Sequence, residues 1–354
     1  MNKKIKILLG AVALAIVAVV AVKLSAGKNP PAPVPVAAAN NLCVYFIPKN
    51  MGNPYFDAIS SGFYHAFAEI GEENFTYKYV GPDVATDTSQ VPYIEEAANA
   101  GAAAIFIAIN SDTALDGLLD QVRARGTRVY FINQDTAPAT KQHRDAAIMP
   151  VNFATVGSAQ IELLASQLGY AGKFAILSAT PEAPDQNAWI ETIKNQLDNN
   201  PAYAKMELVE IVYGDDQSGK STVMMKSLLE KYPDLNGVIA PTAVGLPAAC
   251  AVLEREEMAG KITITGLGLP SEMARFVRSG TCQAFHLWTP PDEGYIAGYL
   301  VWAEKKLGIA VKPGATFPAG KLGNYTVRPN GQILALEAPM LYNAANIEKY
   351  AVQY

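Results

Sequence analysis

The sequence predicts an α/β fold of two lobes, each a doubly wound parallel sheet, joined by a hinge of several strands. Short apolar runs rich in β-branched residues alternate with helix-length amphipathic segments, which is the pattern of βαβ units. The alternation runs from residue 42 to about 150 and then starts again. With 354 residues, of which 50% are hydrophobic and 17% charged, the chain is long enough to bury two medium-sized cores.

The first lobe is expected to contain residues 42–150 and the last part of the chain, from about 289 to 354. Its expected strands are 42–48, 75–80, 103–109 and 128–133, with 147–151 as a strand leaving the lobe. Its expected helices are 55–71, 88–100, 112–125 and 291–307, and the turn signal at 329–331 indicates short strands near the end.

The second lobe is expected to span residues 151–288, with the same design. Its expected strands are 173–178, 206–213, 237–240 and 262–266, followed by an extended segment at 283–288. Its expected helices are 155–169, 187–199, 219–232, 245–258 and 270–279. Because the chain crosses between two similar lobes several times, we expect a hinge and a ligand cleft between them.

The N-terminal 26 residues predict export. Lys3, Lys4 and Lys6 precede an uninterrupted apolar stretch at 7–22, whose length lies between that of a signal peptide and the ~20 residues of a membrane span. Segment 1–26 is therefore a signal peptide or a retained membrane anchor. Residues 27–41 are rich in Pro and Ala, which suits an extended linker. Both alternatives place the rest of the chain in the periplasm or at the cell surface.

Composition and motif content exclude several classes of protein. A net charge of −5 without a long basic cluster argues against nucleic-acid binding. Cys43, Cys250 and Cys282 lack the spacing of a metal site, and the three His residues fall in no catalytic motif. We expect no catalytic residues, no metal, no cofactor and no nucleic acid, and we expect a monomer.

Seven apolar runs end in polar residues or in residues with special backbone geometry. The runs are 43–48, 105–109, 129–132, 174–177, 238–240, 262–265 and 284–287. Open parallel sheets bind ligands outside the carboxyl ends of their strands. The residues that follow these runs are therefore the candidates for a binding site.

The candidate residues suit a small, uncharged ligand with several hydroxyl groups. Hydroxyls both donate and accept hydrogen bonds, and the C–H face of a sugar ring packs against an aromatic side chain. Tyr55 and Asn187 are further residues of these types. The predicted ligand-binding residues are Lys49, Asn50, Phe56, Asn110, Asn133, Asp135, Asp185, Gln186, Trp189, Pro241, Ala243, Trp288 and Asp292.

Structural roles are open alternatives for some of these residues. Lys49 and Asn50 could simply begin the first helix, and Asp185 could be the N-cap of helix 187–199. Trp189 lies at a spacing that also suits packing in the core.

Residues 214–221, with the sequence GDDQSGKS, match the P-loop pattern and lie between an expected strand and an expected helix. A phosphate cradle aims backbone N–H groups and a lysine at anionic oxygens, which Asp215 and Asp216 would repel. We therefore expect this loop to cap helix 219–232 and to bind no nucleotide.

Several motifs resemble those of the periplasmic rhamnose-binding proteins of ABC transporters and, more distantly, of autoinducer-2-binding proteins of the same ribose-binding-type superfamily. They are GP (81–82), AILSAT (175–180), QNAWI (186–190), VYGDDQS (212–218), IAPT (239–242), TGLGLPSEM (265–273), WTPPDEGY (288–295) and YNAANI (342–347). The resemblance runs from about residue 42 to the C-terminus. It implies a type I periplasmic binding protein fold.

The autoinducer-2 branch implies particular ligand contacts at matching positions of this sequence. These positions are Lys49, Asn133, Asp185 with Gln186, and Pro241 with Ala243. Asn133 is a departure, because the family usually has Asp there, so either the hydroxyl pattern differs or Asp135 takes over. Gly268 also stands where ribose-type binders often carry Asp.

The resemblance implies an exported solute-binding protein that closes around a monosaccharide or small polyol, rhamnose-like, and delivers it to an ABC permease. The alternative is a membrane-tethered protein that binds autoinducer-2 or a sugar and signals to a receptor. Both are binding functions without catalysis.

Overall fold

The computed structural model describes residues 41–136 and 143–352. The predicted signal or anchor segment 1–26 and the linker up to residue 40 lie outside the described residues. Within the described ranges, no helix is both long enough and apolar enough to cross a membrane.

The first sheet has six parallel strands in the order β13-β5-β4-β3-β1-β2. In β1, Val44 and Phe46 pack into one hydrophobic cluster, whereas Tyr45 and Ile47 pack into another on the opposite face. Burial on both faces is typical of a parallel sheet covered by helices. The strands are β1 (Leu42–Ile47), β2 (Phe75–Tyr79), β3 (Ala104–Ile107), β4 (Arg128–Ile132), β5 (Ala146–Met149) and β13 (Gln332–Leu334).

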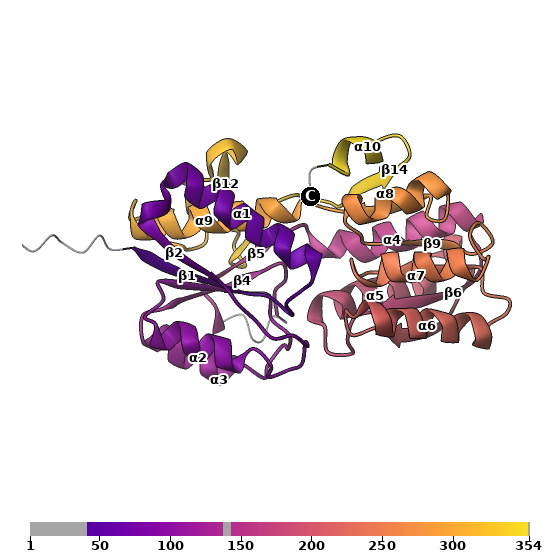
Figure 1. Ribbon diagram of the computed structural model, residues 1–354, viewed down its shortest axis with the longest axis horizontal. Helices are drawn as coiled ribbons and strands as arrows, with labels where there is room; N and C mark the ends of the chain where they lie inside the picture. The colour runs from indigo at the N-terminus through magenta and orange to yellow at the C-terminus, as the bar shows by residue number, and fades with distance from the viewer. Residues whose placement is uncertain (1–40, 137–142, 353–354) are drawn as a thin grey trace, which may run out of the picture. The chain divides into compact units, whose positions relative to one another are not determined.

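Two pairs of helices cover the faces of this sheet (Figure 1). Phe63 of α1 and Leu300 of α9 pack in the cluster that contains Phe46. Ile94 of α2 and Leu119 of α3 pack in the opposite cluster. The helices are α1 (Pro54–Ile70), α2 (Val91–Asn99), α3 (Asp116–Ala124) and α9 (Pro290–Lys305).

The second sheet has four parallel strands in the order β7-β6-β8-β9, again with helices on both faces. Phe174 of β6 packs with Ile161 of α4 and Ile190 of α5, whereas Leu177 lies in the cluster that contains Leu246 of α7. The strands are β6 (Ala171–Ser178), β7 (Lys205–Tyr213), β8 (Gly237–Ala240) and β9 (Thr263–Gly266). The helices are α4 (Phe153–Leu168), α5 (Pro184–Asn199), α6 (Ser218–Lys231), α7 (Gly245–Arg255) and α8 (Pro270–Ser279).

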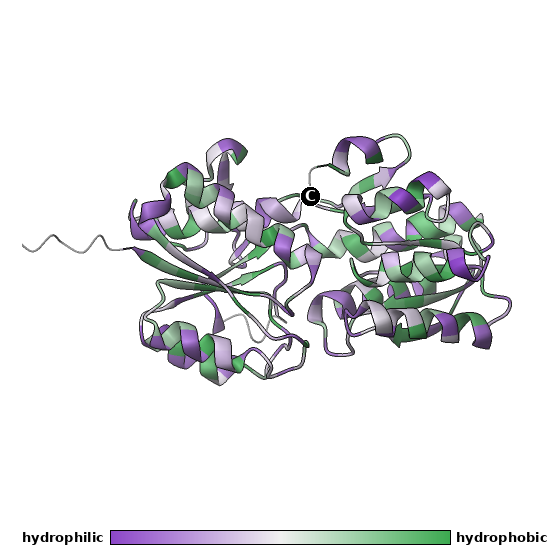
Figure 2. Ribbon diagram, viewed as in Figure 1, coloured by the Kyte–Doolittle hydropathy of each residue, from purple (hydrophilic) through white to green (hydrophobic). Residues whose placement is uncertain are grey.

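The hydropathy of the chain follows this layering. Figure 2 shows apolar strands inside both sheets and polar residues over much of the outer faces of the helices. The prediction of an α/β fold with two parallel-sheet lobes is confirmed.

The end of the chain divides between the two lobes. β13 joins the first sheet beside β5, but β14 (Met340–Asn343) pairs antiparallel with β10 (Ala284–Leu287) of the second lobe. α10 (Ile347–Tyr350) also contacts α8, through an ion pair of 2.7 Å between Arg278 and Glu348. A hairpin of β11 (Thr316–Pro318) and β12 (Asn324–Thr326) precedes this segment.

The expectation that residues 289–354 all return to the first lobe is therefore wrong for the last elements. β10 needs a partner at the edge of the second lobe, and the four residues of β14 are too few to reveal that pairing in the sequence. The chain crosses between lobes at 149–153, 287–290 and 334–340, which agrees with the expected hinge of several segments.

Candidate binding site

The carboxyl ends of strands from both sheets meet around one cavity. Lys49 and Asn133 follow β1 and β4 of the first lobe, and Pro241, Leu267 and Trp288 follow β8, β9 and β10. The cavity is lined by Lys49, Asn53, Tyr55, Phe56, Asn133, Asp185, Gln186, Trp189, Asp216, Pro241, Thr242, Ala243, Leu267, Leu287 and Trp288. This is the place where open parallel sheets hold ligands.

A buried ion pair joins the two lobes across the cavity. Lys49 Nζ lies 2.8 Å from Asp185 Oδ1, and the two side chains are only 6% and 4% exposed. Asp216 also faces Lys49; burial raises the pKa of the Asp216 carboxyl, and the Lys49 charge partly opposes this rise. One cation thus serves two carboxylates, so Lys49 is the electrostatic centre of the site.

Asp216 reaches the cavity because of an unusual turn after β7. Asp215 and Asp216 both adopt left-handed backbone conformations, with φ of 53° and 50°. Asp is among the residues that tolerate this region best. The Thr242 hydroxyl, from the loop after β8, donates a hydrogen bond to Asp216. The Asp216 carboxylate is therefore fixed at the edge of the sheet.

α5 contributes an amide and an indole to the cavity. The Gln186 side-chain oxygen accepts hydrogen bonds from Ser178 Oγ at 2.6 Å and from the Ala179 backbone N–H at 2.8 Å. This leaves the amide nitrogen of Gln186 as the group available to a ligand. Trp189 packs edge-on against Trp288, with ring centroids 6.0 Å apart, and also against Phe153. Trp189 thus belongs both to the core and to the cavity wall.

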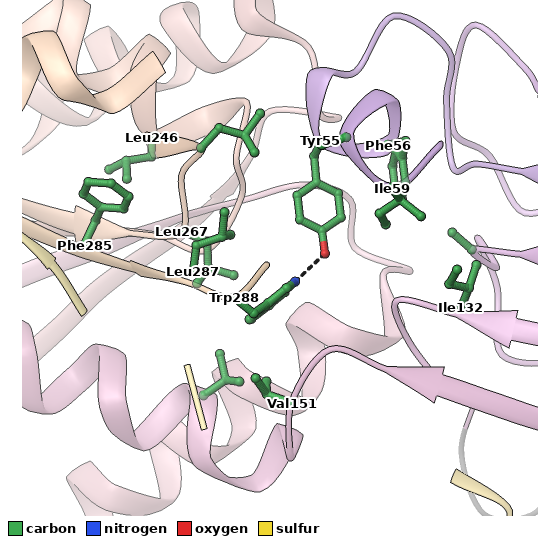
Figure 3. Packing of buried hydrophobic residues seen from close by; sticks show 14 of the residues in the cluster. Tyr55, Phe56, Ile59, Ile132, Val151, Leu246, Leu267, Phe285, Leu287 and Trp288 are labelled. Carbon is green, nitrogen blue, oxygen red and sulfur yellow. Dashed lines mark hydrogen bonds between the residues drawn. The ribbon is translucent and has the colours of Figure 1, made fainter. Parts of the chain in front are cut away.

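Tyr55 and Trp288 form another part of the cavity wall, and Figure 3 shows the hydrogen bond between them. Trp288 Nε1 donates to the Tyr55 hydroxyl at 2.6 Å. The same hydroxyl contacts the Asn133 side-chain oxygen and lies 2.9 Å from Glu293 Oε1. Asn133 itself has a left-handed backbone, with φ of 72°. Leu267 and Leu287 complete the apolar surroundings.

The structure brings most of the predicted ligand-binding residues together at this cavity. Those that line it are Lys49, Phe56, Asn133, Asp185, Gln186, Trp189, Pro241, Ala243 and Trp288. Asp185 lies within the first turn of α5, whose N-cap is Ala183, and its side chain pairs with Lys49. Its expected alternative role as the N-cap residue is therefore wrong.

Asp135 is placed away from the cavity. Both of its carboxylate oxygens are bound by Arg144, through Nε and a terminal nitrogen at 2.6 Å each, and Gln332 Nε2 donates to it at 2.7 Å. Such a bidentate pair leaves little capacity for a ligand. Asp135 therefore anchors β13 to the first lobe, and it does not line the cavity as Asn133 does.

Asn50, Asn110 and Asp292 are also outside the lining of this cavity. Asn110 donates to the Lys49 backbone oxygen at 3.0 Å, so it supports the loop that carries Lys49. Asn50 accepts a hydrogen bond of 3.4 Å from Asn53. Asp292 lies in the first turn of α9, where acidic residues are favourable. Each has a structural role that strand-end position alone did not reveal.

Sequence reasoning missed part of the site. The residues absent from the prediction are Asn53, Tyr55, Asp216, Thr242, Leu267 and Leu287. Tyr55 is of the aromatic type that the sequence analysis expects at the site, but it is not among the predicted ligand-binding residues. Asp216 carried a usable signal, since it follows the expected strand 206–213 just as the predicted residues follow theirs.

Residues 214–221, which match the P-loop pattern, differ in structure from a phosphate-binding loop. Lys220 forms an ion pair with Asp215, and Asp216 turns toward the cavity instead. α6 begins at Ser218 with Gln217 as its N-cap, whose side chain makes no capping hydrogen bond. The loop thus supplies the N-cap residue of α6, as expected, and it carries the two carboxylates of Asp215 and Asp216.

We predict that Lys220→Ala leaves sugar affinity unchanged, because Lys220 is exposed, pairs with Asp215 of the same loop and does not line the cavity. ATP with magnesium should give no thermal shift in the unaltered protein, since two carboxylates repel a polyanion. Differential scanning fluorimetry checks both points. A dose-dependent ATP shift that disappears in Lys220→Ala would contradict the prediction.

In the described part of the chain, no group of three or more His, Cys, Asp or Glu side chains could hold a metal ion. The cavity instead combines one ammonium group, carboxylates, side-chain amides and indole rings. This donor and acceptor set suits a polar organic ligand held by hydrogen bonds and ring stacking.

Comparison with known families agrees with this geometry. The profile of the family described as "Periplasmic binding protein domain" matches residues 44–308. The chain belongs to the periplasmic binding protein family. The match covers the second sheet, the first sheet apart from β13, and the strand ends that line the cavity.

Several solved structures of this family are similar to the chain. A sugar ABC transporter protein from Actinomyces odontolyticus is 37% identical, with a TM-score of 0.68, over 89% of this chain and 98% of that one. A solute-binding protein from Clostridium phytofermentas with bound L-rhamnose is 29% identical, with a TM-score of 0.80, over 89% and 99%. The LsrB protein from Clostridium saccharobutylicum in complex with AI-2 is 21% identical, with a TM-score of 0.79, over 87% and 99%.

Proposed function

We propose that this periplasmic binding protein captures a monosaccharide or small polyol, with L-rhamnose as the first candidate, and delivers it to an ABC permease. The observation that carries the proposal is the cavity itself. Side chains that donate and accept hydrogen bonds face it from both lobes, beside the rings of Tyr55, Trp189 and Trp288.

The chemistry of the cavity favours a neutral polyhydroxyl ligand over an ion. Lys49 is already neutralised by Asp185, with Asp216 close by, so an anion would meet net negative charge. A sugar hydroxyl can donate to a carboxylate and accept from Lys49 or from a side-chain amide. The indole rings offer the apolar face that a sugar ring requires.

Two relatives support a sugar as the ligand. The Clostridium phytofermentas protein was solved with L-rhamnose, and the Actinomyces odontolyticus protein is named as a sugar ABC transporter. Both cover nearly all of the described chain. We infer that the protein works in the periplasm or at the cell surface, either held by an uncleaved N-terminal segment or released by its cleavage.

The alternative ligand is autoinducer-2, in a protein that signals to a membrane receptor. The positions that the autoinducer-2 branch implies are Lys49, Asn133, Asp185, Gln186, Pro241 and Ala243, and all of them line the cavity. Asn133 still differs from the Asp of that branch. The same cavity would serve both functions, so the ligand decides between them.

A thermal-shift screen of pentoses, deoxyhexoses, polyols and autoinducer-2 tests the proposal. A ligand at 100 times its Kd adds about 2.7 kcal/mol to the free energy of unfolding. We expect the largest shift with L-rhamnose or a close relative, and the same shift in Lys220→Ala. Autoinducer-2 as the only stabilising compound would favour the alternative, and no shift with any compound would contradict both.

A further inference from the structure

Glu293 is a buried acid behind the wall of the binding cavity. It lies in the first turn of α9, and its side chain is 0% exposed. Among the described residues, no lysine or arginine forms an ion pair with it, and its Oε2 atom has no hydrogen-bond partner. An ionised carboxylate in this position would lack both a counter-charge and part of its hydrogen bonding, which is costly.

The hydrogen bonds around the Tyr55 hydroxyl indicate whether the Glu293 carboxyl carries a proton. Trp288 Nε1 can only donate to this hydroxyl, so Tyr55 accepts there. The remaining contacts, Asn133 Oδ1 and Glu293 Oε1, are both oxygens that accept when Glu293 is ionised. Tyr55 has a single proton to donate. With the Asn133 amide oxygen toward Tyr55, as the structure has it, one of the two acceptors would face a lone pair of the Tyr55 oxygen, unless the Glu293 carboxyl carries its own proton.

A neighbouring charge also opposes the ionisation of Glu293. Asp292 precedes it in α9, and the negative charge of Asp292 raises the pKa of the Glu293 carboxyl. Burial raises the pKa of Glu293 well above its ordinary value, against the smaller opposing effects of Tyr55 and Trp288. Burial likewise raises the pKa of the Tyr55 hydroxyl, so Tyr55 keeps its proton.

We propose that Glu293 is a protonated residue that positions Asn133 through Tyr55. The Glu293 carboxyl donates to the Tyr55 hydroxyl, and Tyr55 donates to Asn133 Oδ1. The amide NH₂ of Asn133 is thereby presented to the ligand. The inference rests on the proposed function for the identity of that ligand. The site then offers a hydrogen-bond donor after β4. A ligand hydroxyl or ring oxygen at this point is bound as an acceptor.

The test compares Glu293→Gln with the unaltered protein without any ligand. If Glu293 is protonated in the folded protein, its carboxyl keeps its proton at pH values where it would be ionised in the unfolded chain. The folded unaltered protein therefore loses stability as pH rises above the pKa of an unfolded glutamate. As pH rises from about 5 to about 8, we expect the stability of Glu293→Gln to increase relative to that of the unaltered protein. The ratio of the two folding constants should change by up to about tenfold per pH unit. Urea unfolding at several pH values measures this.

A control and a spectroscopic measurement complete the test. Glu95→Gln changes an exposed glutamate of α2 and should leave the pH profile unaltered. Infrared spectra at about pH 8 should contain a protonated-carboxyl band that Glu293→Gln removes and Glu95→Gln keeps. A Glu293→Gln variant that gains no stability relative to the unaltered protein as pH rises, or the absence of that band in the unaltered protein, would overturn the proposal. Failure of every sugar to bind would refute the proposed function but would not alter these results.

Discussion

Lys49→Ala should weaken ligand binding more than any other single change in the cavity wall. Removing one partner of a buried ion pair costs about 3–5 kcal/mol, because an uncompensated buried charge is left behind. Here Asp185 and Asp216 would face each other without a cation. Because the pair lies at the cavity and joins the two lobes, this penalty falls on the arrangement that holds the ligand, so we expect affinity to fall by a factor of about 100 or more.

Asp185→Ala should have a smaller effect, since Asp216 still balances the charge of Lys49. The loss of one charge-assisted hydrogen bond costs about 1.5–3 kcal/mol, which is roughly 10- to 100-fold in affinity. Calorimetry with the sugar found in the screen measures both variants. The matched control is Lys220→Ala, which removes the cation of the more exposed ion pair between Lys220 and Asp215 and should change affinity by less than about twofold. Equal affinities in Lys49→Ala and Lys220→Ala would show that the buried pair has no part in binding.

The strand ends of the site could be predicted because each depends on local sequence. A buried strand of four to eight residues is visible as an apolar run, and the residue after it must lie at the edge of the sheet. Lys49, Asn133, Pro241 and Trp288 were all found by this argument. The same argument predicts Asp216, which follows β7, although its loop also matches the P-loop pattern of a phosphate site.

The remaining differences come from partners that are distant in sequence. Asp135 follows β4 only two residues after Asn133, yet Arg144 and Gln332 bind it, and Gln332 is 197 residues away. The pairing of β14 with β10 is of the same kind, because four residues carry little information about which edge they join. The sequence does not predict a role for Glu293, because its partners are also distant in sequence. Its position depends on Tyr55 of α1, which in turn contacts Asn133 after β4 and Trp288 after β10.

The close packing of α1 on α9 leads to the second large effect. A Cβ atom at Gly62 would lie 1.9 Å from the Pro291 backbone oxygen, and one at Gly294 would lie 2.0 Å from the Ile59 backbone oxygen. Both obstacles are backbone atoms, which cannot rotate away as a side chain can. Gly62→Ala and Gly294→Ala should therefore force the helices apart and lower the free energy of unfolding by about 3 kcal/mol each, at the upper end of the range for overpacking.

The same separation should weaken ligand binding, because α1 carries Tyr55 and α9 carries Glu293, whose contact of 2.9 Å depends on the distance between the two helices. Urea unfolding measures the stability, and calorimetry measures the affinity. Gly117→Ala in α3 is the matched control: no atom lies within 4 Å of its added Cβ, so it should gain about 0.5–1 kcal/mol from the better helix propensity of alanine. If Gly294→Ala were as stable as Gly117→Ala, the two helices would not be held in backbone contact, and the position of Glu293 behind Tyr55 would need another cause.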